Sequence, residues 1–251
     1  MSDVVRLEQD AQRIVEMAAE QGVVLRLLGG LAVRIHSPSA THRSLARRYP
    51  DLDFVLASKR ADRVEAVLGE LGYAPNQTFN LLNGDRRLLF YEERGERQID
   101  VFVNRFHMCH SIPIEAERLA LEPLTLPLAE LLLTKMQIVQ INEKDIRDIC
   151  ALILDHSFGE GDEETFRLSM ITHLCCQDWG LYKTVAINAQ KVRQFADAYD
   201  LEGSQKMTIA QRLDVLNRAL EEAPKNLRWK ARDRIGERVQ WYDLPVEVEW
   251  G

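Results

Sequence analysis

The sequence predicts an α+β protein in which a small sheet is flanked by helices and followed by a C-terminal helical bundle. Three observations support this prediction. Short β-leaning runs of apolar residues occur in the first half of the chain, and stretches with helical spacing separate them. The last roughly 95 residues carry helical periodicity throughout. We therefore expect a first domain over residues 1–155 and a helical domain over residues 156–251.

In the first half, each expected element is marked by its spacing or by its boundaries. Apolar residues at three- and four-residue intervals predict the helices, and alternating or continuous apolar runs predict the strands. Gly29-Gly30 separates the first strand from a helix, Gly72 ends another helix, and residues 93–96 have the composition of a turn between two strands. The expected elements are a helix over 4–19, a strand over 23–28, a helix from 31, a strand over 51–56, a helix over 61–71, and strands over 87–91 and 98–103.

The second half is predicted from helix boundary signals. Pro127 is a good first helical residue, and the helical pattern runs from it through Ile141. Asn142 can cap a following helix that extends to about residue 155. We expect a linker over residues 159–162 and a capping box over residues 208–211.

Composition narrows the class of protein. The 251 residues are 46% hydrophobic and 28% charged, which is close to the averages for globular domains and argues against disorder, collagen-like repeats and coiled-coil rods. The net charge of −7 argues against a protein whose whole surface binds nucleic acid, although it excludes neither a local basic patch nor a nucleotide substrate. No apolar run approaches the ~18 residues of a membrane helix, and the N-terminus does not resemble a signal peptide. We therefore expect a cytoplasmic protein with no membrane partner.

Cysteine usage points to reduced, packed thiols. The cysteines form no C-x-x-C pair, two of them are adjacent, and three lie in apolar helical stretches. The segment His107-Met108-Cys109-His110 contains metal ligands, but no matching pair stands elsewhere at zinc-site spacing. The four cysteines are Cys109, Cys150, Cys175 and Cys176.

Three acidic residues suggest a cation site. Asp51 and Asp53 are two apart on a predicted strand, so their side chains project from one face about 6.5–7 Å apart. Asp100 lies on the strand face opposite Ile99 and Val101 and could converge with them. Mg²⁺ prefers oxygen ligands and completes its shell with water and phosphate, so such a set suits a triphosphate site. The alternative is that each aspartate ends a strand or satisfies a turn.

The glycine pair adds a phosphate-binding feature. Gly29 and Gly30 lie between a strand and a helix, where backbone amides and the helix N-terminus can hold phosphate oxygens without obstruction by a Cβ. By itself the pair could be only a tight turn. The ordered combination of strand, glycine turn, helix and acid-x-acid strand is more informative than any single part.

These motifs resemble those of the polymerase-β-type nucleotidyltransferase superfamily. The matching segments are L-L-G-G-L-A-V-R, D-L-D-F-V and Q-I-D-V-F-V, between about Val23 and Val103. A later segment, L-L-L-T-K-M-Q-I-V-Q-I-N-E-K-D-I-R-D-I, is similar to motifs of the AbiEii/AbiGii toxin-type nucleotidyltransferases and extends the match to about Leu154. The resemblance implies that residues 1–155 form the nucleotidyltransferase domain, with a small mixed sheet of that type.

The resemblance also implies roles for individual residues. Asp51, Asp53 and Asp100 would be catalytic and would bind two Mg²⁺ ions, and Gly29 and Gly30 would bind the triphosphate of an NTP such as ATP. The later motif would consist of the helix lysine Lys135, followed by Lys144, Asp145 and Asp148. Lys144 stands where that family usually has arginine.

Purely structural roles for the residues of the later motif stay open as alternatives. Lys135 could extend along an apolar helix face to reach solvent. Asp145 could oppose the helix dipole, and Asp148 could pair with Lys144 one turn away.

An arginine-containing insertion departs from the family pattern. The interval from Gly30 to Asp51 is longer than usual, and the family often places an arginine shortly before the paired acids. Arg47 and Arg48 are nearer to those acids than Arg43 and are our preferred contacts for the triphosphate, although arginines in a polar loop are often only solvated.

Aromatic and basic residues are interleaved near the C-terminus. Such residues could stack bases and hold phosphates, but aromatics in helices are usually packing residues. The aromatic members are Trp179, Tyr182, Trp229, Trp241, Tyr242 and Trp250, and the basic members are Lys225, Arg228, Lys230, Arg232 and Arg234.

The predicted function is Mg²⁺-dependent transfer of a nucleoside monophosphate from an NTP to an acceptor hydroxyl. The resemblance implies an acceptor among RNA, with transfer RNA as one candidate, proteins and small molecules. The toxin-type match adds a growth-arresting role with an antitoxin protein as partner. The alternatives are a catalytically inactive nucleotide-binding or scaffold protein and an antibiotic nucleotidyltransferase.

Overall fold

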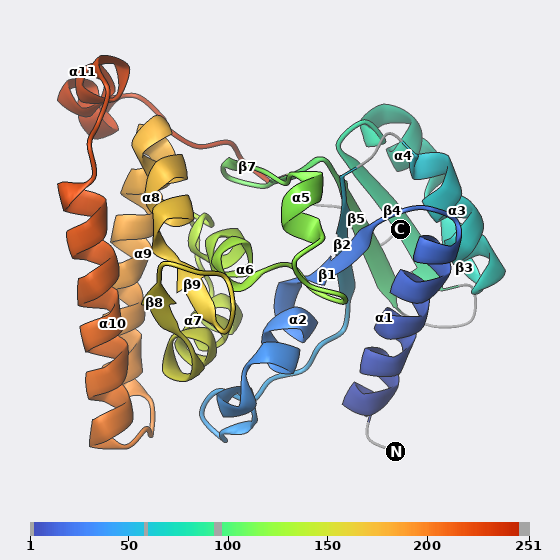
Figure 1. Ribbon diagram of the computed structural model, residues 1–251, viewed down its shortest axis with the longest axis horizontal. Helices are drawn as coiled ribbons and strands as arrows, with labels where there is room; N and C mark the ends of the chain where they lie inside the picture. Colours follow the sequence, from blue (N-terminus) through green and yellow to red (C-terminus); the bar gives the residue numbers. More distant parts are fainter. Residues whose placement is uncertain (1–2, 58–59, 93–96, 246–251) are drawn as a thin grey trace. The chain divides into compact units, whose positions relative to one another are not determined.

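The computed structural model describes residues 3–57, 60–92 and 97–245, which divide into two compact units (Figure 1). The first unit comprises Met1–His36, Arg47–His107 and Pro113–Pro127. The second comprises Ser37–Ala46, Met108–Ile112 and Leu128–Gly251. The domain boundary expected between residues 155 and 156 stays a prediction, and the turn expected at 93–96 lies outside the described residues.

The first unit is built on a five-stranded mixed sheet. Strand β2 runs parallel to its neighbour β5, whereas the other neighbouring pairs run antiparallel. This sheet, with its flanking helices, confirms the predicted α+β class (Figure 1). In spatial order the strands are β1 (Leu25–Leu28), β2 (Leu52–Leu56), β5 (Gln98–Val103), β4 (Arg87–Glu92) and β3 (Tyr73–Pro75).

Helices of the first unit pack on this sheet. Helix α1 (Asp3–Glu20) buries Leu7, Ala11, Ile14, Val15 and Ala18, the apolar stripe expected from its spacing, and packs against β1 and α3 (Figure 1). Helix α2 (Gly29–His36) follows β1 directly, and α3 (Ala61–Glu70) ends before Gly72, which has a φ of +86°.

Two short helices of the first unit were not expected from the sequence. Helix α4 (Gln77–Asn83) is capped by Asn76, whose side chain accepts a hydrogen bond of 3.0 Å from the Phe79 backbone N–H. It buries none of its own residues, which explains why no apolar periodicity revealed it. Helix α5 (Ala116–Leu119) is a single turn.

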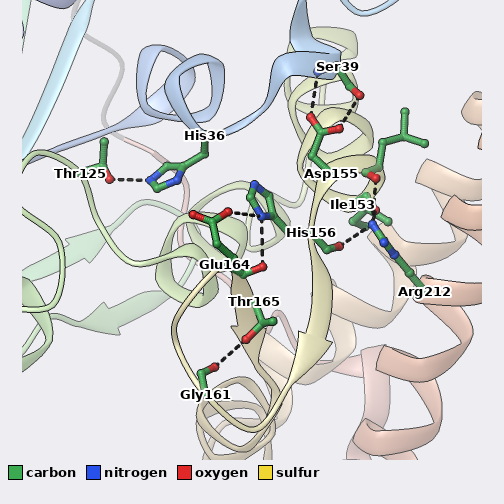
Figure 2. Close-up of polar contacts among 11 residues, drawn as sticks. His36, Ser39, Thr125, Ile153, Asp155, His156, Gly161, Glu164, Thr165 and Arg212 are labelled. Atoms are coloured by element: carbon green, nitrogen blue, oxygen red, sulfur yellow. Dashed lines mark hydrogen bonds and ion pairs between the residues drawn. The ribbon is translucent and has the colours of Figure 1, made fainter.

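A chain segment borders the β1 edge of the sheet. The Leu27 N–H donates to the Leu124 carbonyl at 2.8 Å, and the Leu126 N–H donates to the Leu27 carbonyl at 2.9 Å. Between these bonds, His36 Nε2 and Thr125 Oγ1 lie 2.6 Å apart (Figure 2). The outward backbone groups of Leu27 are therefore satisfied, and a side chain at the end of α2 contacts the same segment.

The second unit is mainly helical, as predicted. Helices α8, α9 and α10 lie side by side, and α6 packs against α7, α8 and α9 (Figure 1). The helices are α6 (Leu128–Met136), α7 (Glu143–Asp155), α8 (Leu168–Gln177), α9 (Trp179–Ala198), α10 (Gly203–Glu222) and α11 (Leu227–Ile235), with 3₁₀ turns η1 (Pro38–Thr41) and η2 (Gly236–Arg238).

Polar contacts join α7 to other parts of the second unit. Asp155 accepts hydrogen bonds from Ser39 N–H at 2.8 Å and Ser39 Oγ at 2.6 Å (Figure 2). Arg212 of α10 donates to the carbonyls of Ile153, Leu154 and His156 at 2.6, 2.9 and 2.8 Å. These carbonyls lie at the C-terminal end of α7, where carbonyl groups have no hydrogen-bond partner within the helix. Arg212 therefore caps α7.

Three local predictions for the second half are wrong. The helix expected through Ile141 ends at Met136, and Asn188 Nδ2 donates to the carbonyls of Met136 and Ile138 just beyond it. Residues 208–211 lie inside α10, where Thr208 Oγ1 donates to the Ser204 carbonyl. The actual capping box uses Glu202 and Gln205.

The third error concerns the helical periodicity expected throughout the last roughly 95 residues, because a short parallel strand pair, β8 (Ser157–Gly159) and β9 (Thr165–Arg167), interrupts it. The expected linker at 159–162 lies largely in the connection between these strands, since residues 160–162 are neither helix nor strand. A further two-stranded sheet is formed by β6 (Arg105–His107) and β7 (Ser111–Pro113). Within the described ranges, every helix is too short or too polar to cross a membrane.

Candidate active site

Two of the predicted acids are direct neighbours in the sheet. Asp53 on β2 and Asp100 on β5 are Cα partners in the parallel pairing, so their side chains leave the same face. Adjacent strands lie about 4.8 Å apart, which places the two positions within reach of a shared ligand. Asp51 is exposed and stands two residues before Asp53, at the entry to β2.

The glycine bend lies directly against Asp53. Leu28, the last residue of β1, is the Cα partner of Asp53, so Gly29 begins α2 next to that carboxylate. Gly29 has a φ of +74°, and a Cβ there would overlap Asp53 Oδ2 and lie 2.9 Å from its Cγ. Both the backbone conformation and the closeness of the acid therefore require glycine at this position.

Arg47 occupies the space beside the second glycine. A Cβ on Gly30 would lie only 2.6 Å from Arg47 Cζ. The half-buried guanidinium donates to the Arg48 carbonyl at 2.8 Å and stands 4.7 Å from the centre of the Tyr49 ring. Arg47 is thus held as a cation at the N-terminus of α2, next to the glycine bend.

The other arginines of the insertion differ from Arg47. Arg48 is exposed and supplies its backbone carbonyl to Arg47. Arg43 belongs to the second unit, where it forms an exposed ion pair with Asp200. Of the three candidates, the structure brings Arg47 to the glycine bend.

Asp100 is held by two residues that the sequence analysis missed. Its side chain is 5% exposed; Arg87 Nε donates to Oδ1 at 2.6 Å, and Gln98 Nε2 donates to Oδ2 at 2.7 Å. The Arg87 guanidinium carbon lies 5.7 Å from the Phe79 ring centre and 5.4 Å from that of Phe102. The acid therefore has a buried counter-charge that is itself fixed between two aromatic rings.

Hairpin register is the signal that could have found Arg87. Leu89 is the Cα partner of Asp100, and Arg87 lies two residues earlier on β4, hence on the same face. Gln98 lies two residues before Asp100 on β5 and shares that face as well.

The three acids offer only carboxylate oxygens as possible cation ligands. Within the described residues, no group of three or more His, Cys, Asp and Glu side chains is assembled as a metal site. Mg²⁺ commonly takes only one or two protein carboxylates and completes its octahedron with water and substrate phosphates. Asp53, which lies against the glycine bend, and Asp51, which is exposed at the entry to β2, supply carboxylates of that kind. Asp100 does so only by exchanging its bond to Arg87 for a cation.

The later motif forms a separate charged cluster in the second unit. Lys135 Nζ of α6 lies 3.0 Å from Asp145 Oδ1 and 2.9 Å from Asp148 Oδ2, both on α7. All three side chains are largely buried, with exposures of 12, 15 and 4%. The expected cap of α7 is confirmed, because Asn142 Oδ1 accepts from the Asp145 N–H at 3.1 Å. Lys135 is therefore held between two carboxylates rather than extended along an apolar face to solvent.

The cysteines and histidines of the sequence analysis lie in structural settings. All four cysteines are free and buried, which confirms the expected packed thiols. Burial raises the pKa of Cys150 to about 12, so it is a poor nucleophile at neutral pH. His110 is buried, and its ring Nε2 lies 2.8 Å from Thr184 Oγ1. The backbone N–H of His110 donates to Gln137 Oε1 at 2.6 Å.

Comparison with known proteins gives fold similarity at low sequence identity. No protein-family model matches the chain, and no curated protein matches it significantly. The solution structure of the antibiotic-resistance factor ANT(2″)-Ia is similar with a TM-score of 0.43 and 13% identity, over 70% of this chain and 96% of that one. The crystal structure of ANT(2″)-Ia with adenylyl-2″-tobramycin gives a TM-score of 0.39 and 15% identity, over 61% and 88%.

A third similar structure is an antigenic nucleotidyltransferase-like protein from Paracoccidioides brasiliensis. Its TM-score is 0.38 at 15% identity, over 71% of this chain and 91% of that one. Similarity at this level does not assign a reaction, which must be argued from the residues themselves.

Proposed function

We propose that the chain is a Mg²⁺-dependent nucleotidyltransferase that moves a nucleoside monophosphate from an NTP to an acceptor hydroxyl. The strongest support is a single arrangement: Gly29 contacts the Asp53 carboxylate, and Asp53 is the register partner of Asp100. A phosphate-binding bend and neighbouring acids are what phosphoryl chemistry on a triphosphate requires.

Phosphate binding is proposed for the glycine bend and Arg47. The N-terminus of α2 presents backbone amides and the positive end of its dipole, and the absence of a Cβ at Gly29 and Gly30 lets Asp53 and Arg47 lie directly against it. Arg47 adds a planar cation that suits phosphate oxygens. Arg48 is proposed as an exposed second contact. The family resemblance adds Lys135 and Asp145 of the second unit to the nucleotide-binding residues.

Cation binding is proposed for the three acids. Asp51 and Asp53 would hold the two expected Mg²⁺ ions, and Asp100 would join them at the acceptor side once Arg87 releases it. When bound, such ions stabilise charge on the attacking and leaving oxygens.

The proposed reaction is an in-line substitution at phosphorus. The acceptor oxygen attacks the α-phosphorus of the NTP, the bond to the β-phosphate oxygen breaks, and pyrophosphate leaves. The hydroxyl proton passes to the Asp100 carboxylate or to water.

The acceptor and the biological role are proposed from the resemblance alone. RNA, proteins and small molecules are the candidate acceptors, and the AbiEii-type match favours a toxin with an antitoxin partner. A cytoplasmic location, expected from the sequence, belongs to the same proposal.

A second candidate function is nucleotide binding without transfer. It is favoured by one observation: both oxygens of Asp100 accept hydrogen bonds, one from Arg87 and one from Gln98. A protein that never exchanges these bonds would bind an NTP at the glycine bend and leave it intact.

The test uses α-labelled NTPs with pooled RNA, cell protein and an aminoglycoside as separate acceptors. We expect label transfer and pyrophosphate release with one acceptor, and a loss of roughly 10³-fold in Asp53→Asn because metal-assisted stabilisation is worth several kcal/mol. Asp85→Asn, at an exposed acid of the same unit, is the matched control and should transfer normally.

Two outcomes decide against the proposal. Full transfer by Asp53→Asn would show that the acid is not part of the machinery. Tight NTP binding by the wild-type protein without pyrophosphate release for any acceptor would favour the second candidate.

A further inference from the structure

The segment 225–238 concentrates positive charge in an acidic protein. It contains six basic and two acidic residues, a formal charge of +4, whereas the whole chain carries −7. The rest of the chain therefore carries −11. This basic segment comprises the end of the loop after α10, helix α11 and the turn η2.

The two acids of the basic segment are directed to partners in the second unit. Asp233 Oδ1 accepts a hydrogen bond of 2.6 Å from Trp179 Nε1. Glu237 Oε1 lies 2.8 Å from Lys183 Nζ of α9. Neither acid is therefore engaged with a cation of the segment itself through these bonds.

Two of the six basic side chains of this segment donate hydrogen bonds to backbone carbonyls. Lys225 Nζ donates to the carbonyls of Leu220 and Glu221 at the end of α10. Arg232 donates to the carbonyls of Gly236 and Val239 at 2.6 and 2.7 Å. These two side chains hold the segment in shape.

The other four basic side chains of the segment are exposed to solvent. These are Arg228, Lys230, Arg234 and Arg238. Across the described ranges 3–57, 60–92 and 97–245, none of their side chains has a hydrogen bond or ion pair. Arg228 and Arg234 are six residues apart on α11, about 9 Å along its axis. The result is a set of exposed basic side chains on α11 and η2 that form no ion pairs with the described residues and carry a net positive charge even after the two acids of the segment are counted.

The aromatic residues interleaved with these cations are packing residues. Trp229 is 8% exposed, donates to the Cys175 carbonyl at 3.1 Å and packs edge-on against Tyr182. Trp179 is 4% exposed and packs against Trp241. Base stacking on the two buried tryptophans is therefore not available, and the exposed chemistry of the segment is cationic.

We propose that α11 and η2 form a docking surface for the phosphate backbone of RNA. Closely spaced, outward cations bind a phosphate polymer by releasing its counterions, without reading its sequence. An anionic membrane is disfavoured because an interfacial helix needs a continuous apolar face. The largest apolar residue of α11, Trp229, points inward, while exposed Leu227 and Ile235 lie eight residues apart among the cations.

The choice of RNA over DNA rests on the proposed function. RNA is the polyanion among the candidate acceptors of the transfer reaction. The docking surface itself requires no catalysis, so its test omits NTP and Mg²⁺ and is carried out equally well with Asp53→Asn.

The experiment measures binding of a fluorescein-labelled, unstructured 20-nucleotide RNA by anisotropy over a range of salt concentrations. The test variant is Arg228→Gln/Lys230→Gln/Arg234→Gln. The control is Arg6→Gln/Arg13→Gln/Arg218→Gln, which removes the same charge at other exposed positions. Circular dichroism and Tm show that both variants are folded.

Wild type and control should bind RNA with a steep salt dependence. The test variant should lose about two units of the slope of log affinity against log salt, and about a hundredfold in affinity near 0.1 M salt, since each phosphate contact contributes about 0.7 to the slope. Asp53→Asn should bind RNA like the wild type even if it transfers nothing.

Three results would overturn the proposal of this docking surface. The wild type does not bind RNA, the control variant binds RNA as weakly as the test variant, or the test variant binds RNA with unchanged affinity. Tighter binding to DNA of the same sequence, or to phosphatidylserine vesicles but not RNA, would overturn the choice of partner.

Discussion

Arg87 Nε and Asp100 Oδ1 lie 2.6 Å apart in the first unit, with side-chain exposures of 16 and 5%. The proposed third metal ligand therefore carries its own counter-charge, supplied from the neighbouring strand. Two cationic partners, an arginine and a divalent ion, would compete for the same carboxylate. Such competition would make the proposed response of the protein to Mg²⁺ depend on Arg87.

Arg87→Gln should destabilise the protein and increase its response to Mg²⁺. Removing one partner of a buried ion pair costs about 3–5 kcal/mol because the remaining charge is uncompensated. A cation bound by the freed Asp100 would return part of that loss. We expect a lower Tm in EDTA and a larger rise of Tm on adding Mg²⁺ than in the wild type.

The control for this measurement is Arg86→Gln, at an exposed neighbour. It should leave both the Tm and its Mg²⁺ response nearly unchanged. An Arg87→Gln protein with a normal Tm, or with no additional stabilisation by Mg²⁺, contradicts the competition.

Gly29→Ala should damage the candidate active site more than backbone strain alone would. Its φ of +74° costs about 1–2 kcal/mol for an L-residue, and the new Cβ would displace the Asp53 carboxylate. Gly72→Ala is the matched control, because Gly72 has a φ of +86° and open space around its Cα.

Urea unfolding and transfer assays separate the two effects. Both variants should lose a similar amount of stability from strain, and Gly29→Ala should lose about 100-fold more transfer activity, as expected for a displacement near 1 Å. Equal activity of the two variants would mean that the glycine bend does not position Asp53.

Removing the positive charge of Lys135 should destabilise the protein, and removing the two neighbouring negative charges as well should restore most of its stability. Lys135→Met leaves Asp145 and Asp148 side by side and uncompensated, at a cost of about 3 kcal/mol. Adding Asp145→Asn and Asp148→Asn removes the unbalanced charges and should recover most of the unfolding free energy. A combined variant no more stable than Lys135→Met would show that the ion pairs are not the cause.

The same variants test the nucleotide-binding role that the resemblance implies for Lys135. If Lys135 also contacts the triphosphate, the combined variant regains stability but still binds an NTP more weakly than the wild type. Recovery of both stability and affinity would assign Lys135 a structural role alone.

Cys150 should resist alkylation in the folded protein. With its pKa raised to about 12 by burial, only about one thiol in 10⁴ is a thiolate at pH 8, and the side chain has no exposed surface. Iodoacetamide at pH 8, followed by mass spectrometry, should leave Cys150 unmodified until urea unfolds the chain. Modification of Cys150 at equal rates with and without urea would contradict its placement in the core.

Local patterns predicted most of the first unit. The stripe of α1 and the apolar runs of β1, β2 and β5 each follow a period set by one element, and such periods are readable from the chain. The same alternation correctly placed Asp100 on the face away from Ile99 and Val101, since Asp100 shares a face with Asp53.

Pairing between distant strands could not be predicted in this way. The register of Asp53 with Asp100 depends on β2 lying parallel to β5, which brings together segments more than forty residues apart. Arg87 was missed because its partner is defined by hairpin register rather than by its own neighbours in sequence. Helix α6 ends early where Asn188, about fifty residues later, takes its carbonyls.

The most direct test of the proposed active site is a crystal structure with Mn²⁺ and a non-hydrolysable NTP analogue. The anomalous signal locates the metal independently of any assay. We predict Mn²⁺ at Asp51 and Asp53, with the triphosphate along Gly29 and Gly30 and in contact with Arg47. Mn²⁺ and triphosphate bound elsewhere, with the Asp53 carboxylate contacting neither, would contradict the account.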